Sequence, residues 1–248
     1  MKRFIISFTS VFLGAITHLQ ATPNYLTDSN RPKRVGDLEG SFSLGYDSHY
    51  QFNGETFGRD VLWGSVDANL PVASGWWLGM NATYWDITSA IDGFEREFDL
   101  SFALTKELSP NTWLSLVATR YSYLGDFSDE SELGVELEHT WKRIDFSLWY
   151  GRTFEDSGHY AEANISRAFH VNELISIVPS VQVGFASGYE DLGSGFTHIG
   201  FRIDFPLDFT DNISLVPYIA ANVPLHALRS VELTDETIYA GIALRCRF

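Results

Sequence analysis

The sequence alternates between apolar and polar residues with a period of two from Leu38 to Phe248. Near the middle, for example, Phe98 and Leu100 flank Asp99. This period is typical of β-strands that have one apolar and one polar face. The pattern predicts an all-β fold of about twelve strands, each roughly ten or more residues long, whereas strands in ordinary sheets have about five or six.

The predicted connections alternate between short and long. Short ones fall at 72–75, 108–111, 142–143, 170–173 and 208–212, and longer ones at 53–60, 86–96, 125–131, 154–159, 187–195 and 226–236. Short periplasmic turns and longer extracellular loops are the pattern of outer-membrane barrels. An even number of strands also puts both ends of the barrel segment on the periplasmic side.

The N-terminus has the order of features found in an export signal. A basic pair opens the chain and precedes a mostly apolar run, Phe4–Ile16, which is too short to cross a bilayer. Small Ala21 then suits a signal-peptidase site. Residues 1–21 are therefore expected to form a cleaved signal peptide.

The rest of the chain divides into two parts. Residues 22–37 are polar and non-periodic, which predicts a periplasmic lead-in, and residues 38–248 form the strand-rich domain. Removing the two basic residues of the leader takes the formal net charge from −15 to −17. Nucleic-acid binding, which needs clustered Lys and Arg, is not expected.

Alternation alone fits both a soluble β-sandwich and a membrane barrel, since each has one apolar strand face. The last residue, Phe248, favours the barrel. An aromatic end to a complete strand has no evident use in a soluble protein, whereas in a barrel it joins the interfacial aromatic girdle. We therefore expect a closed antiparallel transmembrane β-barrel, an up-and-down meander of about twelve strands in the bacterial outer membrane.

The last strand resembles the insertion signal of bacterial outer-membrane proteins, which alternates and ends in Phe. The positions that match are Phe248, Cys246, Leu244, Ile242 and Ala240. The resemblance implies that the barrel-assembly machinery is a partner.

The stretch "SLGYDSHYQFNG" (43–54) is similar to the opening strand of TorF-type putative porins. Ser48, Tyr50, Phe52 and Gly54 match that pattern, and Asn53 stands where the family usually has Arg. The resemblance implies a channel without a defined substrate.

Charged and aromatic residues on the polar face are candidates for lining the lumen. They are Trp63, Asp67, Trp77, Asp99, Glu136, Glu138, Asp145, Trp149, Arg202, Asp204, Arg245 and Arg247. Inward acids facing Arg residues would create a transverse field in a diffusion pore. The same charges could instead pair and plug the lumen, and the aromatic rings could stack solutes or merely fill space, so both alternatives stay open.

The function predicted from these features is porin-like passage of small solutes, with no cofactor and no metal site. Outer-membrane lipid and lipopolysaccharide are expected partners. The Asp and Glu residues of the longer loops either hold divalent cations that bridge lipopolysaccharide phosphates, attract cations toward the mouth, or form a solvated surface. One alternative is a lipid-modifying hydrolase. The alternation places His139 on the outer, lipid-facing side of its strand, where such an enzyme would need a histidine. His139 is expected near the periplasmic end, however, and the sequence has no Gly-x-Ser-x-Gly stretch. The other is a structural or adhesive barrel that transports nothing.

Overall fold

The computed structural model describes residues 38–90, 95–124, 128–155, 158–189, 192–230 and 236–248. The expected leader (1–21) and lead-in (22–37) lie outside the described residues. The described chain forms a fourteen-stranded sheet and a short helix, α1 (His226–Ser230). The strands are β1 (Glu39–Phe52), β2 (Glu55–Ala73), β3 (Trp76–Ala90), β4 (Arg96–Ser109), β5 (Thr112–Tyr123), β6 (Glu130–Trp141), β7 (Ile144–Thr153), β8 (His159–Ser166), β9 (Phe169–His170), β10 (Ser176–Ser187), β11 (Gly195–Asp204), β12 (Leu207–Asp208), β13 (Ile213–Pro224) and β14 (Thr237–Arg247).

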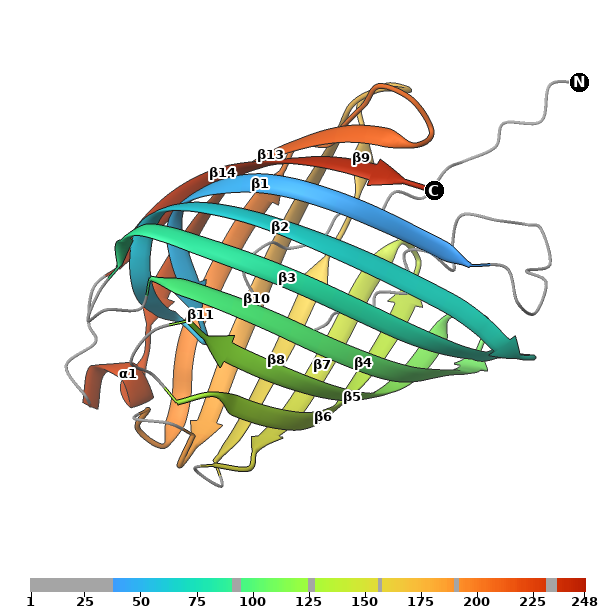
Figure 1. Cartoon of the computed structure of the whole chain (residues 1–248). Helices are drawn as coiled ribbons and strands as arrows, with labels where there is room; N and C mark the ends of the chain where they lie inside the picture. The colour runs from blue at the N-terminus through green and yellow to red at the C-terminus, as the bar shows by residue number, and fades with distance from the viewer. Residues whose placement is uncertain (1–37, 91–94, 125–127, 156–157, 190–191, 231–235) are drawn as a thin grey trace, which may run out of the picture.

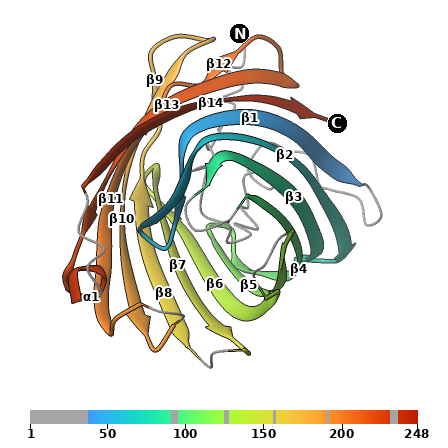
Figure 2. The same cartoon turned by 60° about the vertical axis from the view of Figure 1, so that its left-hand side comes forward.

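The sheet closes on itself, as Figures 1 and 2 show. Each long strand pairs antiparallel with its neighbours in the chain, β11 pairs with β13, and β14 pairs with β1. The two-residue strands β9 and β12 only extend the hairpins to β10 and β13. The wall is therefore a closed up-and-down barrel of twelve long strands, which confirms the predicted fold.

The two ends of the barrel meet at the seam between β1 and β14. Gly40 N–H donates to the Phe248 carbonyl at 3.1 Å, and Phe248 N–H donates to the Gly40 carbonyl at 3.0 Å. Closure leaves no open sheet edge, which a bilayer requires because hydrocarbon cannot satisfy free backbone groups.

Two prolines explain why β9 and β12 are separate from β8 and β11. Arg167 N–H donates to the Pro179 carbonyl at 3.2 Å, and Phe205 N–H donates to the Pro217 carbonyl at 2.9 Å. Neither proline has an N–H to donate in the other direction, so each residue pair forms one backbone hydrogen bond in place of two. The strands opposite therefore break beside Pro179 and Pro217.

The polarity of the wall is the reverse of that in a soluble protein. Along β4, Asp99, Ser101 and Thr105 are buried inside, whereas Phe98 and Phe102 are 39% and 54% exposed outside. A β-sandwich would bury the apolar face and leave the polar one wet. The structure therefore decides between the two folds in favour of the membrane barrel.

The phase of β5, which the sequence alone leaves ambiguous, follows the same rule. Trp113, Val117 and Tyr121 are buried inside, and Leu114 and Leu116 are exposed outside. The inner face is thus not uniformly polar, because β5 contributes apolar and aromatic side chains to it.

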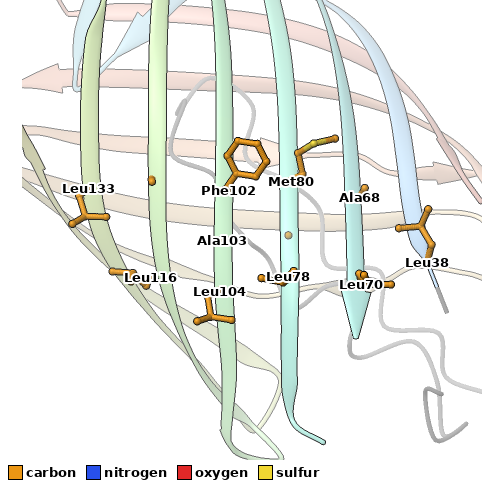
Figure 3. A pocket seen from close by; sticks show the side chains of 12 residues that line it. Leu38, Ala68, Leu70, Leu78, Met80, Phe102, Ala103, Leu104, Leu116 and Leu133 are labelled. Atoms are coloured by element: carbon orange, nitrogen blue, oxygen red, sulfur yellow. The ribbon is translucent and has the colours of Figure 1, made fainter. Parts of the chain in front are cut away.

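The outer wall has an apolar hollow of about 480 Å³ across the strands from β1 to β6. Figure 3 shows side chains from neighbouring strands that line it, among them Leu70, Leu78, Met80, Phe102 and Leu104. Such a surface is suited to acyl chains and would be costly in water.

The two ends of the barrel differ in their connections. Short turns at one end include Lys142 and Arg143, whose φ angles are 50° and 69°. The prediction of a loop over 53–60 at the other end is wrong, because β2 begins at Glu55 and only Asn53 and Gly54 connect β1 to β2. Positive φ at both residues, 51° and 93°, fits the tight two-residue hairpin turn for which Asn-Gly is favoured.

Candidate functional site: the barrel lumen

All twelve residues named as candidates lie on the inner side of the wall, as their pairing and burial show. Six of them have less than a tenth of their surface exposed: Asp99, Trp149, Glu136, Arg202, Asp204 and Arg245. Those that are half-buried are Trp63, Asp67, Trp77, Glu138, Asp145 and Arg247. Their part in solute passage stays a prediction.

Acidic side chains gather on one arc of the inner wall, from β4 to β8. They include Glu97 and Asp99 on β4, Glu132 and Glu136 on β6, and Glu162 on β8, all of them buried. Glu97, Glu132 and Glu162 are not among the twelve candidate lining residues, although the sequence alternation places them on the same polar face.

The arginines lie on the other arc, on β11 and β14. Arg202 donates from Nε and Nη2 to Asp204 Oδ1 at 2.9 and 2.8 Å. Its guanidinium carbon also lies 3.4 Å from the centre of the Tyr218 ring. Arg202 therefore pairs with an inward acid, as one of the two alternatives has it, and Asp204 largely balances its charge.

Polar side chains line the inner wall toward the short-turn end. Asp67 accepts hydrogen bonds from Ser41 Oγ at 3.1 Å and from Asn81 Nδ2 at 2.7 Å. On β4 and β5, Thr105 and Ser115 hydroxyls lie 2.9 Å apart. These polar groups therefore satisfy one another across neighbouring strands.

Aromatic side chains gather toward the long-loop end. The Trp63 and Trp85 rings are 5.7 Å apart, and those of Tyr50 and Trp85 are 5.1 Å apart, between centroids. Trp85 Nε1 donates to Asp99 Oδ2 at 2.9 Å, and the Tyr50 hydroxyl donates to Glu97. The cluster therefore joins apolar rings to buried carboxylates.

The tip of the β1–β2 hairpin turns inward to reach this region, as Figure 2 shows. Phe52 contacts Tyr121 of β5, with ring centroids 5.9 Å apart. Asn222 of β13 donates to the Gly54 carbonyl and, at 3.4 Å, to Gln51 Oε1. Sequence analysis missed this arrangement, although the Asn-Gly dipeptide marks the tight turn.

An ion-pair cluster ties two hairpins together at the long-loop end. Arg120 donates from Nη2 to Asp129 at 3.0 Å and from Nη1 to Glu155 at 3.3 Å, and Glu155 also accepts from Ser131 N–H at 2.9 Å. Burial pushes the pKa of Glu155 up, but the hydrogen bonds from Ser131 and the Arg120 charge outweigh it and hold the pKa below its usual 4.5. Among the described residues no group of three His, Cys, Asp or Glu could hold a metal ion.

His139 is exposed on the outside of β6, at the short-turn end. Its Nδ1 lies 2.9 Å from the Thr112 hydroxyl oxygen. A hydrolase that acts on outer-leaflet lipid would need its histidine at the other end of the barrel, so this contact does not support the enzyme alternative.

The closed ring, the polar inner face and the apolar outer face together define an outer-membrane β-barrel. In the part of the chain that the structure describes, no helix has the length and apolar character to span a bilayer.

Solved structures share this fold at low sequence identity. The KdgM porin superimposes with a TM-score of 0.54 at 10% identity, over 84% of this chain and 99% of that one. An outer membrane channel from Pseudomonas putida F1 gives 0.54 at 12%, over 88% and 97%, and the NanC porin gives 0.53 at 12%, over 84% and 100%. No family model and no curated protein matches. The TorF resemblance stays a prediction.

Proposed function

We propose that the protein is a porin-like channel through which small polar solutes cross the outer membrane passively. The observation that supports this most is a closed twelve-strand ring whose inner face carries hydrogen-bonding and charged side chains, while its outer face is apolar. Barrels of eight strands leave little space beyond side-chain filling, and those of sixteen or more enclose a wide aqueous pore. A twelve-strand ring belongs between them and suits a narrow channel.

The charges of the inner wall favour cations over anions. Buried acids on β4, β6 and β8 outnumber the arginines of β11 and β14, and Arg202 is already paired with Asp204. A cleft lined by one sign of charge raises the local concentration of the opposite ion. One fold neighbour, the KdgM porin, was solved with oligogalacturonate, an acidic sugar chain. For this chain we infer the opposite preference.

Single-channel recording in planar bilayers tests the proposal. We expect discrete conductance steps. In a salt gradient, the reversal potential should have the sign of a channel that passes cations more readily than anions. The double substitution Glu136→Gln with Glu138→Gln should move that potential toward zero, since it removes two inner carboxyl groups. Glu173→Gln is the matched control, because Glu173 is an exposed acid in a short turn.

Silent bilayers would contradict the channel. Silence together with turnover of phospholipid or lipid A would support the hydrolase instead, and silence without turnover would support a structural or adhesive barrel.

We propose two kinds of partner for the assembled barrel. Lipid acyl chains would cover the apolar outer wall, and lipopolysaccharide would lie beside the acidic long-loop end, where divalent cations bridge phosphates to carboxylates. The barrel-assembly machinery would read the terminal strand, where Ile242, Leu244 and Phe248 face outward. Export through a cleaved leader at 1–21 is part of the same proposal.

A further inference from the structure

The outer end of the β1–β2 hairpin leaves the barrel wall. Pairing between β1 and β14 ends at Asp47 and Gly241, although β14 continues beside β13 as far as Thr237. Inner and outer residues alternate along β1 until this point, but Tyr50, Gln51 and Phe52 are buried one after another. A strand that stayed in the wall would expose every second side chain to lipid. The end of β1 is therefore covered on both faces.

One face of the tip packs against the arc that carries the acids. The Tyr50 ring lies against Trp85 of β3, and its hydroxyl donates to Glu97 of β4. Phe52 reaches one strand further and meets the Tyr121 ring edge-on. Aromatic pairs of this geometry stabilise the packed tip beyond what the buried area alone would give.

The opposite face of the tip is held by β11 and β13. Asn222 donates from one amide nitrogen to both Gly54 and Gln51. Gly54 lies so close to His198 that a Cβ at Gly54 would come within 2.7 Å of the His198 Cβ. A side chain at position 54 would therefore collide with β11, in addition to the strain of its φ of 93°. The tip spans the lumen from β5 to β11 and has little freedom to move.

We propose that this inward tip, residues 48–57, is a fixed crossbar that narrows the lumen and sets the size limit for solutes. Phe52 and Asn53 are its specificity-determining residues, because Phe52 fills the side toward β5 and Asn53 is buried at the turn. This inference rests on the proposed channel and adds to it the element that filters solutes. A crossbar tied to both arcs limits passage by its bulk, whereas a loop tied at one end would swing aside.

A trimmed hairpin tests the crossbar. Replacing residues 48–60 by Asn-Gly joins the paired residues Asp47 and Val61 through a two-residue turn. We expect single-channel conductance to rise at least about two-fold, together with faster passage of larger sugars into proteoliposomes, since the obstacle is gone.

Point substitutions keep the proposal testable if the trimmed barrel does not fold. Phe52→Ala with Asn222→Ala removes one contact on each side of the tip and should raise conductance in the same direction. Phe154→Ala is the matched control, because Phe154 is an aromatic of the long-loop end that is 60% exposed. It should leave conductance unchanged.

A chemical readout reports the position of the tip whether or not the barrel conducts. The thiol of Asn53→Cys should react slowly with a membrane-impermeant maleimide, and about ten-fold faster once Phe52→Ala and Asn222→Ala are added, because buried sites react through local opening. The unsubstituted chain, whose single cysteine is Cys246, gives the background rate.

The outcomes separate the crossbar from the channel. A conducting wild type whose trimmed and point variants conduct no better overturns the crossbar and leaves the channel intact. A thiol that reacts as fast in Asn53→Cys as in the loosened variant overturns it as well. A silent wild type with a conducting trimmed variant contradicts the channel and overturns the size filter, because the tip would then close the lumen completely. If every variant is silent, passage of solutes fails, and the size filter is overturned with it even if the thiol is protected.

Discussion

At the scale of single residues, charged side chains on the inner face of the barrel are held by direct contacts with their neighbours. Arg202 shows this most clearly, because Asp204 and the face of Tyr218 hold its guanidinium in place. The inward parity of Arg202 and Asp204 could be predicted from their alternation with apolar neighbours. Their mutual hydrogen bonds could not, because alternation assigns a face and says nothing about which side chains on that face meet.

Replacing Arg202 should destabilise the barrel more than replacing another inward arginine. Arg202→Met leaves the buried carboxylate of Asp204 without its main partner, which typically costs about 3–5 kcal/mol. The measurement is the free energy of unfolding in guanidinium, in detergent micelles or vesicles. Arg247→Met is the control, because it removes the same charge from a half-buried residue near the short-turn end. Equal losses for the two variants would contradict the account.

At the scale of elements, the hairpins differ in how far they depend on long-range contacts. The loss of a ladder hydrogen bond at Pro179 and Pro217 could be predicted from the residue type alone, since a proline has no N–H to donate wherever it lies. The inward turn of β1 and β2 could not, because the residues that hold it, Tyr121 and Asn222, are far away in the chain. The sequence instead predicts a longer loop over residues 53–60.

We predict that the side chain of Phe248, at the end of β14, is needed for efficient assembly of the barrel into the outer membrane. Phe248 is 67% exposed, and its backbone is bonded to Gly40 across the seam. Phe248→Ala keeps those backbone bonds but removes the ring, so we expect less folded barrel in outer-membrane fractions while refolding in detergent stays close to normal. The measurement is the heat-dependent shift in gel mobility.

Phe209→Ala is the matched control, since Phe209 is an aromatic in a short turn that is 61% exposed. If both substitutions lower the folded fraction equally, the terminal Phe has no special part in assembly.

At the scale of the whole molecule, the barrel fold could be predicted from the sequence, but the contacts between side chains inside the barrel could not. The approximate strand number and the meander order follow from alternation and from the spacing of turns, and the terminal Phe248 favours an apolar face toward lipid. Whether charges pair and whether a segment enters the lumen depend on contacts across the barrel, such as Phe52 with Tyr121. Pore and plug are therefore both compatible with the sequence, and the proposed crossbar accounts for a narrowed lumen.

The central claim is that lipid covers the apolar face and that the polar face encloses the lumen. Spin labels at successive residues of β4, in a Cys246→Ala background in bilayers, measure this residue by residue. Collisions with oxygen, which concentrates in lipid, should peak at positions 100, 102 and 104, and at positions 99, 101 and 103 they should be low. Loss of this period of two, or the opposite phase, would contradict the account.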